Sequence, residues 1–127
     1  MPKGLNKVIL IGNLGKAPEF KILSSGIPIA NMSIATAESR KGSNDTWEEH
    51  TEWHNIVFFG KQAEVCRDFL QKGSAVCIEG RLQTRSWEDN DAKKQYRTEI
   101  IGHNLIMLGS KEKAGSQPET EGNDLPF

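Results

Sequence analysis

Residues 51–87 read TEWHNIVFFGKQAEVCRDFLQKGSAVCIEGRLQTRSW, and the spacing of their apolar residues changes twice. Residues 51–59 are apolar on both alternating faces toward their end, as in a strand that is covered on two sides. After Gly60 the apolar side chains recur at helical spacing, at Ala63, Cys66, Phe69 and Leu70. This pattern predicts one short helix, which Lys72-Gly73 would end.

Strict alternation returns at residues 75–87, which predicts another strand. Val76, Ile78 and Leu82 are expected to point inward. The opposite face carries Glu79, Arg81, Gln83, Arg85 and Trp87. A polar cluster at 88–94 leads into a further strand pattern at 95–108, so the two strands are predicted to form a long hairpin.

Two more strand patterns lie upstream, at residues 5–14 and 27–38. In the second of these, Ala30, Met32 and Ile34 share one face. The whole order, with a single short helix between the third and fourth strands, is typical of an all-β, five-stranded Greek-key barrel of the oligonucleotide-binding type (OB-fold). The helix argues against an immunoglobulin-like sandwich.

Length and charge limit the domain organisation. The chain of 127 residues suffices for one packed domain, which we expect at residues 1–108. Residues 109–127 form an acidic, Gly- and Pro-bearing linker and tail that we expect to be disordered. The domain has 14 basic and 13 acidic residues, a net charge of +1, and the tail has two and four, a net charge of −2. Phosphate binding by the domain would therefore need a local basic stripe.

Targeting signals and cysteines give expectations about the compartment. The longest apolar run, Val8-Ile9-Leu10-Ile11, is far shorter than the ~20 residues of a membrane span, and the N-terminus does not resemble a secretion signal. Cys66 and Cys77 stand on different predicted elements without metal-ligand spacing, so we expect both thiols to be reduced and buried. A soluble, cytoplasmic protein without a metal or other cofactor is expected.

Trp87 is the first candidate binding residue. Counting by twos places it on the same face as Arg81 and Arg85, close to Lys93 and Lys94 in the hairpin loop. An indole beside guanidinium groups suits nucleobase stacking with phosphate contacts. The alternative, that Trp87 packs under its own hairpin while the arginines pair with Glu79 or Glu99, fits the sequence equally well.

Trp53 and Phe59 are the second pair of candidates. They are six residues apart and so share one face of their strand, while Ile56 and Phe58 take the other. Placing Trp53, Phe58 and Phe59 all inside a small barrel would crowd it, so a ligand-facing role is favoured over a purely structural one. Because stacking is indifferent to base identity and a duplex hides its base faces, the expected ligand is single-stranded nucleic acid.

Catalytic alternatives have weaker support. His50 and His54 could suggest a metal site, but on a strand residues four apart lie about 13 Å from each other. Gly12 and Gly15 could suggest a phosphate loop, but no Lys-Ser or Lys-Thr pair and no helix follows them. We therefore predict that the protein is not an enzyme.

The C-terminal end suggests a peptide for a partner protein. The last ten residues contain no Lys or Arg, and Leu125 and Phe127 would be exposed to water unless another protein bound them. The predicted recognition segment is Gly122, Asn123, Asp124, Leu125, Pro126 and Phe127. A solvated, frayed end is the alternative.

The sequence resembles the bacterial single-stranded DNA-binding protein family over nearly its whole length. The resemblance rests on KVILIGNLGKAPE at 7–19, TEWHNIVFFGKQAE at 51–64, KGSAVCIEGRLQTRSW at 72–87 and the terminal DLPF. It implies a homotetramer that wraps single-stranded DNA, is associated with the bacterial nucleoid, and recruits replication, repair and recombination proteins through its C-terminal peptide.

The resemblance also implies roles for individual residues. Trp53, Phe59 and Trp87 match base-stacking positions, and His54 matches a position at the subunit interface. The matching cationic positions near the DNA path are Lys7, Lys61, Lys72 and Arg85. Independently, the apolar strand around Val8 and Leu10 suits an intersubunit contact.

Two departures from the family leave questions open. Arg40 stands where many members have a Trp, and we expect it to contact phosphate; whether Trp47 replaces that Trp stays open. The linker after Gly109 is short, which leaves the reach of the tail open.

The alternative function is an interaction module of the same fold, such as a primosome-type accessory barrel, whose aromatic residues contact protein.

Overall fold

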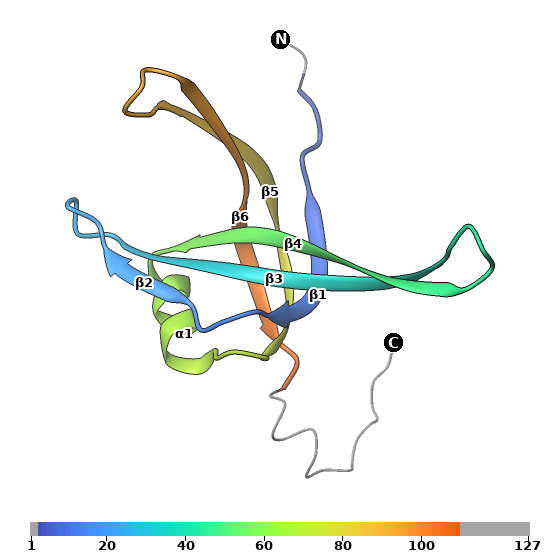
Figure 1. Cartoon of the computed structure of the whole chain (residues 1–127). Coiled ribbons are helices and arrows are strands. Elements are labelled where there is room, and N and C mark those ends of the chain that lie inside the picture. The colour runs from blue at the N-terminus through green and yellow to red at the C-terminus, as the bar shows by residue number, and fades with distance from the viewer. Residues whose placement is uncertain (1–2, 110–127) are drawn as a thin grey trace.

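The computed structural model describes residues 3–109, which contain six strands and one helix (Figure 1). The elements are β1 (Val8–Leu14), β2 (Glu19–Ile22), β3 (Pro28–Lys41), β4 (Trp47–Phe59), α1 (Lys61–Phe69), β5 (Ala75–Glu88) and β6 (Lys94–Met107). The acidic tail and its predicted recognition segment, residues 122–127, lie outside the described residues.

Five of the strands close into a barrel. The sheet order is β1-β5-β6-β4-β3, and pairing of β3 with β1 at Asn13↔Ala35 and Leu14↔Ile34 completes the circle. β4 and β6 run parallel, whereas the other barrel pairs are antiparallel. The helix follows β4, the third barrel strand, and precedes β5, the fourth. The predicted OB-fold barrel is therefore confirmed.

The core takes one face of each strand and one side of the helix. Its fully buried side chains include those of Ala30, Ile34, Ile56, Phe58, Val76, Ile78, Ala63 and Cys66. A Cβ on Gly102 of β6 would collide with the Phe58 ring, so the backbone of this glycine lies directly against that ring. Burial raises the pKa of the Cys66 thiol to about 11. Both cysteines are free, but only Cys66 is buried as expected, and Cys77 is half-buried. Within residues 3–109 the helix α1 has nine residues, far fewer than the ~20 that a membrane-spanning helix needs.

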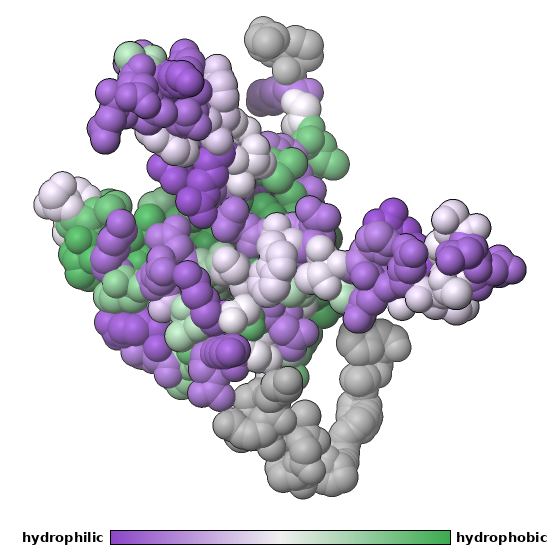
Figure 2. All heavy atoms as spheres, viewed as in Figure 1, coloured by the Kyte–Doolittle hydropathy of each residue, from purple (hydrophilic) through white to green (hydrophobic). Residues whose placement is uncertain are grey.

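Two hairpins extend beyond the barrel. The β3–β4 hairpin and the β5–β6 hairpin leave it in different directions (Figure 1), and we call them the β3–β4 arm and the β5–β6 arm. Register pairs continue along the first arm to Lys41↔Trp47 and along the second to Glu88↔Lys94. The tips of both arms are mostly hydrophilic, while hydrophobic surface gathers nearer the barrel (Figure 2).

The structure corrects two sequence-based expectations and adds one strand. Leu82 is exposed, because it lies on the β5–β6 arm where that arm has left the barrel. Phe69 is also exposed, because the helix turns Ala63, Cys66 and Leu70 toward the core and carries Phe69 away from it. Finally, the short strand β2 was not predicted; it adds to the edge of β3 through pairs such as Phe20↔Ala30.

Phe58 and Phe59 offer a matched test of the fold. Phe58→Ala should lower the free energy of unfolding by about 3–5 kcal/mol, because it empties a fully buried site in the core. Phe59→Ala should lower it by less than about 1 kcal/mol, because this ring is on the outer face. Chemical denaturation followed by circular dichroism measures both values, and equal losses would contradict the assigned faces.

Candidate nucleic-acid interface

Alternation along β4 presents two aromatic rings to the outside. Trp53 is 56% exposed and Phe59 is 42% exposed, whereas Ile56 and Phe58 are fully buried. The expected division of these four residues between two faces is therefore observed. Neither Trp53 nor Phe59 belongs to the buried core cluster, so both rings are open to a ligand or to another protein surface.

Gly15 lies against Trp53. A Cβ at position 15 would lie 2.5 Å from the indole ring, so only glycine leaves the ring room in this position. The residue follows directly after β1, at the point where the chain leaves the barrel wall. Gly15 thus forms part of the surface against which the Trp53 ring lies. No helix begins at this turn, as a phosphate loop would require.

The outer face of β5 carries the third ring. Trp87 is 44% exposed on the β5–β6 arm, opposite Gln95. The guanidinium of Arg85 lies 5.7 Å from the centre of the indole, within the range of a cation–π interaction. Arg81, on the same face of β5, donates a hydrogen bond to Gln83 at 2.9 Å. Trp87 is therefore accessible and is not packed beneath its hairpin.

A buried carboxylate holds Arg85 in place. Glu99 on β6 is 4% exposed and accepts hydrogen bonds from Nε and Nη2 of Arg85 at 2.9 and 3.0 Å. Arg97 approaches the same carboxylate at 3.8 Å. The pairing of an arginine with Glu99, which the sequence left open, is thus present together with the exposed indole. An arginine has five N–H donors, so three of those of Arg85 are not used by Glu99.

β6 lies between β4, which carries Trp53 and Phe59, and β5, which carries Trp87. It pairs with β4 through Ile56↔Ile100 and Val57↔Ile101, and with β5 along its whole length. Where β4 and the arm diverge, a groove of about 210 Å³ opens. Its lining includes Trp53, Asn55, Leu82 and Glu99. We call it the ring groove, since it begins at Trp53 and reaches the carboxylate that holds Arg85.

The other predicted cations are spread around the barrel. Lys7 forms an ion pair with Glu79, and this lysine holds the pKa of the Glu79 carboxyl below its usual range. Lys61 begins α1 two residues after Phe59, and Lys72 lies between α1 and β5. Arg40 is in an ion pair with Glu38 at 3.4 Å. The structure therefore brings Arg85 next to a predicted ring and keeps Arg81 on the same face of β5, but it does not gather all the predicted cations into one stripe.

Sequence reasoning did not assign four residues that line the ring groove to a binding site: Asn55, Leu82, Thr98 and Ile100. Asn55 lies on the same face of β4 as Trp53, two residues away, so alternation alone could have placed it there. Leu82 could not have been found in this way, because its position depends on where the β5–β6 arm leaves the barrel.

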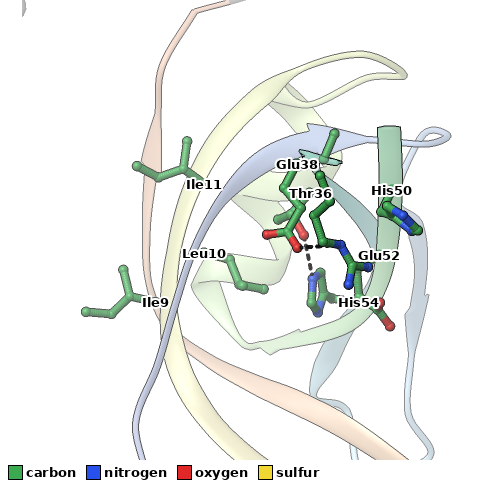
Figure 3. A pocket seen from close by; sticks show the side chains of 10 residues that line it. Ile9, Leu10, Ile11, Thr36, Glu38, His50, Glu52 and His54 are labelled. Atoms are coloured by element: carbon green, nitrogen blue, oxygen red, sulfur yellow. Dashed lines mark hydrogen bonds and ion pairs between the residues drawn. The ribbon is translucent and has the colours of Figure 1, made fainter. Parts of the chain in front are cut away.

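A second groove, of about 420 Å³, lies between β1 and the β3–β4 arm (Figure 3). We call it the β1 groove. Leu10, Thr36 and His54 line it, and Thr36 Oγ1 and His54 Nε2 are hydrogen-bonded at 2.9 Å. Ile9 and Ile11 also border it, but their side chains point to the other side of β1 (Figure 3).

The exposed apolar residues of β1 are not the two that the sequence analysis placed at a subunit interface. Val8 and Leu10 are partly buried against the core, whereas Ile9 and Ile11 are the exposed apolar residues. The apolar pattern on both faces of this strand could not show which face would be open. His50 and His54 both border the β1 groove, but within residues 3–109 no group of three or more His, Cys, Asp or Glu side chains could hold a metal ion.

Comparisons with known proteins agree on one family. The model of the single-strand binding protein family matches residues 5–108. The single-stranded DNA-binding protein 1 of Chlorobaculum tepidum is 50% identical over 116 residues, which are 91% of this chain and 72% of that protein.

Two solved structures share the fold. A Plasmodium falciparum SSB in complex with ssDNA has a TM-score of 0.79 and 36% identity, over 86% of this chain and 99% of that one. A deletion mutant of the single-stranded DNA binding protein from Thermus aquaticus has a TM-score of 0.75 and 30% identity. That match covers 87% of this chain and 54% of the Thermus chain.

Proposed function

Because the chain belongs to the single-strand binding protein family, we propose that it binds single-stranded DNA without sequence preference by stacking bases on Trp53, Phe59 and Trp87. Proteins of this family bind DNA and are not enzymes. The protein would protect exposed strands during replication, recombination and repair, in the bacterial cytoplasm and at the nucleoid.

The observation that carries this proposal is the exposure of all three rings on outer strand faces, with the ring groove opening beside Trp53. Each stacked base contributes ~1–3 kcal/mol, so three rings could supply several kcal/mol of binding free energy. The described domain is almost electrically neutral, and its cations are dispersed. Stacking would therefore carry a larger share of the affinity than phosphate contacts do.

Phosphate contacts would complement the rings. Arg85 is the best placed cation, because Glu99 fixes it beside Trp87 and leaves three N–H donors unused. The other proposed phosphate-binding residues are Lys7, Arg40, Lys61, Lys72 and Arg81. Those already paired with a carboxylate, such as Lys7, would have to exchange or share that partner.

Ring-by-ring substitution tests the stacking proposal. Trp53→Ala and Trp87→Ala should each weaken binding of oligo-dT by ~1–3 kcal/mol, because each removes one platform. Intrinsic tryptophan fluorescence of the full chain should be quenched by oligo-dT but hardly by duplex DNA.

Phe69→Ala is the matched control, since it removes a ring that is 66% exposed on α1, away from the ring groove. Unchanged oligo-dT affinity in both folded tryptophan variants would remove these residues from the site. Absence of quenching by single strands would favour the alternative, an interaction module of the same fold.

We further propose that the chain assembles as a homotetramer through β1 and its neighbours. β1 pairs with β3 only at its last two residues, so in the described chain the other edge of residues 8–12 has no strand partner. Next to that edge, Ile11, Cys77 and Ile106 are cross-strand neighbours on the outer face, with Ile9 beside them. We call these four residues the outer stripe. An open strand edge beside an apolar stripe suits contact with further copies of the chain.

The assembly is tested by solution mass. The full chain should have four times the mass of one 14.1 kDa chain. Ile11→Asp should reduce that mass, because it places a charge in the outer stripe. Ile22→Asp, at a similarly exposed isoleucine on β2, should leave the mass unchanged. A monomeric wild-type chain, or an Ile11→Asp variant of full mass, would contradict the proposal.

The C-terminal peptide is proposed to recruit replication, repair and recombination proteins. Its support is compositional: residues 118–127 contain three acidic and no basic residues, and they end on Asp-Leu-Pro-Phe. The same charge could compete with DNA for the domain when DNA is absent.

Deleting residues 118–127 separates these two roles. If the tail competes with DNA, the deletion should tighten oligo-dT binding at low salt and change it little at high salt. Equal affinity at low salt would reject competition while leaving recruitment intact. Recruitment predicts that a chain lacking only Phe127 loses binding to a purified replication or repair protein that the full chain binds.

A further inference from the structure

Trp47, which begins β4 at the outer end of the β3–β4 arm, is the most exposed of the three tryptophans, at 70%. Lys41 is its register partner on β3. The arm around it is mostly hydrophilic (Figure 2), so this indole is a large flat surface in a polar setting.

Trp47 belongs to the same strand face as Trp53 and Phe59. Six residues separate Trp47 from Trp53 and six separate Trp53 from Phe59, so all three fall on one face of a continuous strand. The opposite face of the arm turns toward the β1 groove. The residues that β4 contributes to the lining of this groove are His50, Glu52 and His54, which alternate with the face of Trp47 and Trp53. Trp47 is absent from that lining, in agreement with the counting.

Arg40 lies on the groove-facing side. It borders the β1 groove together with Glu38, its ion-pair partner, and the register places it opposite Glu48 rather than Trp47. Any phosphate contact of Arg40 would therefore be made from the opposite side of the arm. It is Trp47, and not Arg40, that continues the line of rings on β4.

We propose that Trp47 is a further stacking platform for an unpaired nucleobase, at the outer end of the line that Phe59 and Trp53 begin. This inference rests on the proposed single-stranded DNA binding and extends its site along the arm. Lys41 supplies a cation next to the ring, as Arg85 does at Trp87. Its ion pair with Asp45, at 3.5 Å, joins two exposed side chains and can be exchanged for a phosphate.

The spacing sets the length of DNA that reaches this platform. Six residues of strand span about 20 Å at ~3.3 Å per residue. At ~3.4 Å per nucleotide, the spacing of a stacked strand, about six nucleotides bridge Trp53 and Trp47, and a more extended strand needs fewer. The contribution of Trp47 should therefore appear with long oligonucleotides and be small with very short ones.

A single-tryptophan protein reports directly on this ring. The chain has three tryptophans, so the full-length Trp53→Phe/Trp87→Phe variant retains Trp47 alone, while its phenylalanines keep the other platforms aromatic. Oligo-dT of about 20 nucleotides should quench its emission, and duplex DNA of the same length should not. Unchanged emission, in a sample whose binding is verified by anisotropy of a labelled oligo-dT, would overturn the proposal.

Affinity provides the second measurement. Trp47→Ala in the otherwise unchanged chain should weaken binding of the same oligo-dT about 5- to 150-fold, which corresponds to ~1–3 kcal/mol for one stacked base. Trp47→Phe should recover much of that loss, and Phe69→Ala, which removes a ring of similar exposure, should show none.

The possible outcomes separate this inference from the proposed function. Full affinity of Trp47→Ala would overturn the role of Trp47 alone. A reduced solution mass of that variant would also overturn it, by showing that the ring contacts another subunit. If the unaltered chain did not bind oligo-dT, the proposed function itself would fail.

Discussion

The structure depends on the alternation of side chains across each strand of a closed barrel. Every second residue must fill an interior that has room for little more than these side chains, so the residues between them are left on the outer face. Phe58 and Phe59 show the consequence most clearly, since one ring is fully buried and its neighbour is 42% exposed. The same rule places Trp53 outside, and carries the line of rings along β4 to Trp47.

On a nearly neutral domain, exposed rings give a binding mode that does not rely on a strong positive field. The local electrostatics agree with this: several cations are already matched by carboxylates, as Lys7 is by Glu79 and Arg85 by Glu99. The Arg85–Glu99 pair restricts one guanidinium to a position beside Trp87 and leaves part of its donor set available. Such a surface would hold bases through their faces and use phosphates mainly to orient the strand.

Period-two and helical patterns were enough to predict the barrel, the position of its helix and the outward faces of Trp53, Phe59 and Trp87. Features that depend on register could not be predicted. Arg85 pairs with Glu99 rather than Glu79 because the β5–β6 register places Glu99 opposite Gln83, two residues before Arg85 on the same face of β5. Leu82 is exposed because its strand has left the barrel. In β1, apolar residues on both faces concealed that Ile9 and Ile11, rather than Val8 and Leu10, are open. The roles of the site residues and of the C-terminal peptide stay predictions.

Comparing binding of oligo-dT with binding of an abasic oligonucleotide of equal length, at the same salt concentration, tests the central claim most directly. The two ligands share their phosphates and differ in the bases that could stack. If bases are held on exposed rings, the abasic strand should bind far more weakly and leave the tryptophan emission unquenched. Equal affinity for both strands would show that phosphate contacts alone hold the DNA, and would contradict this account.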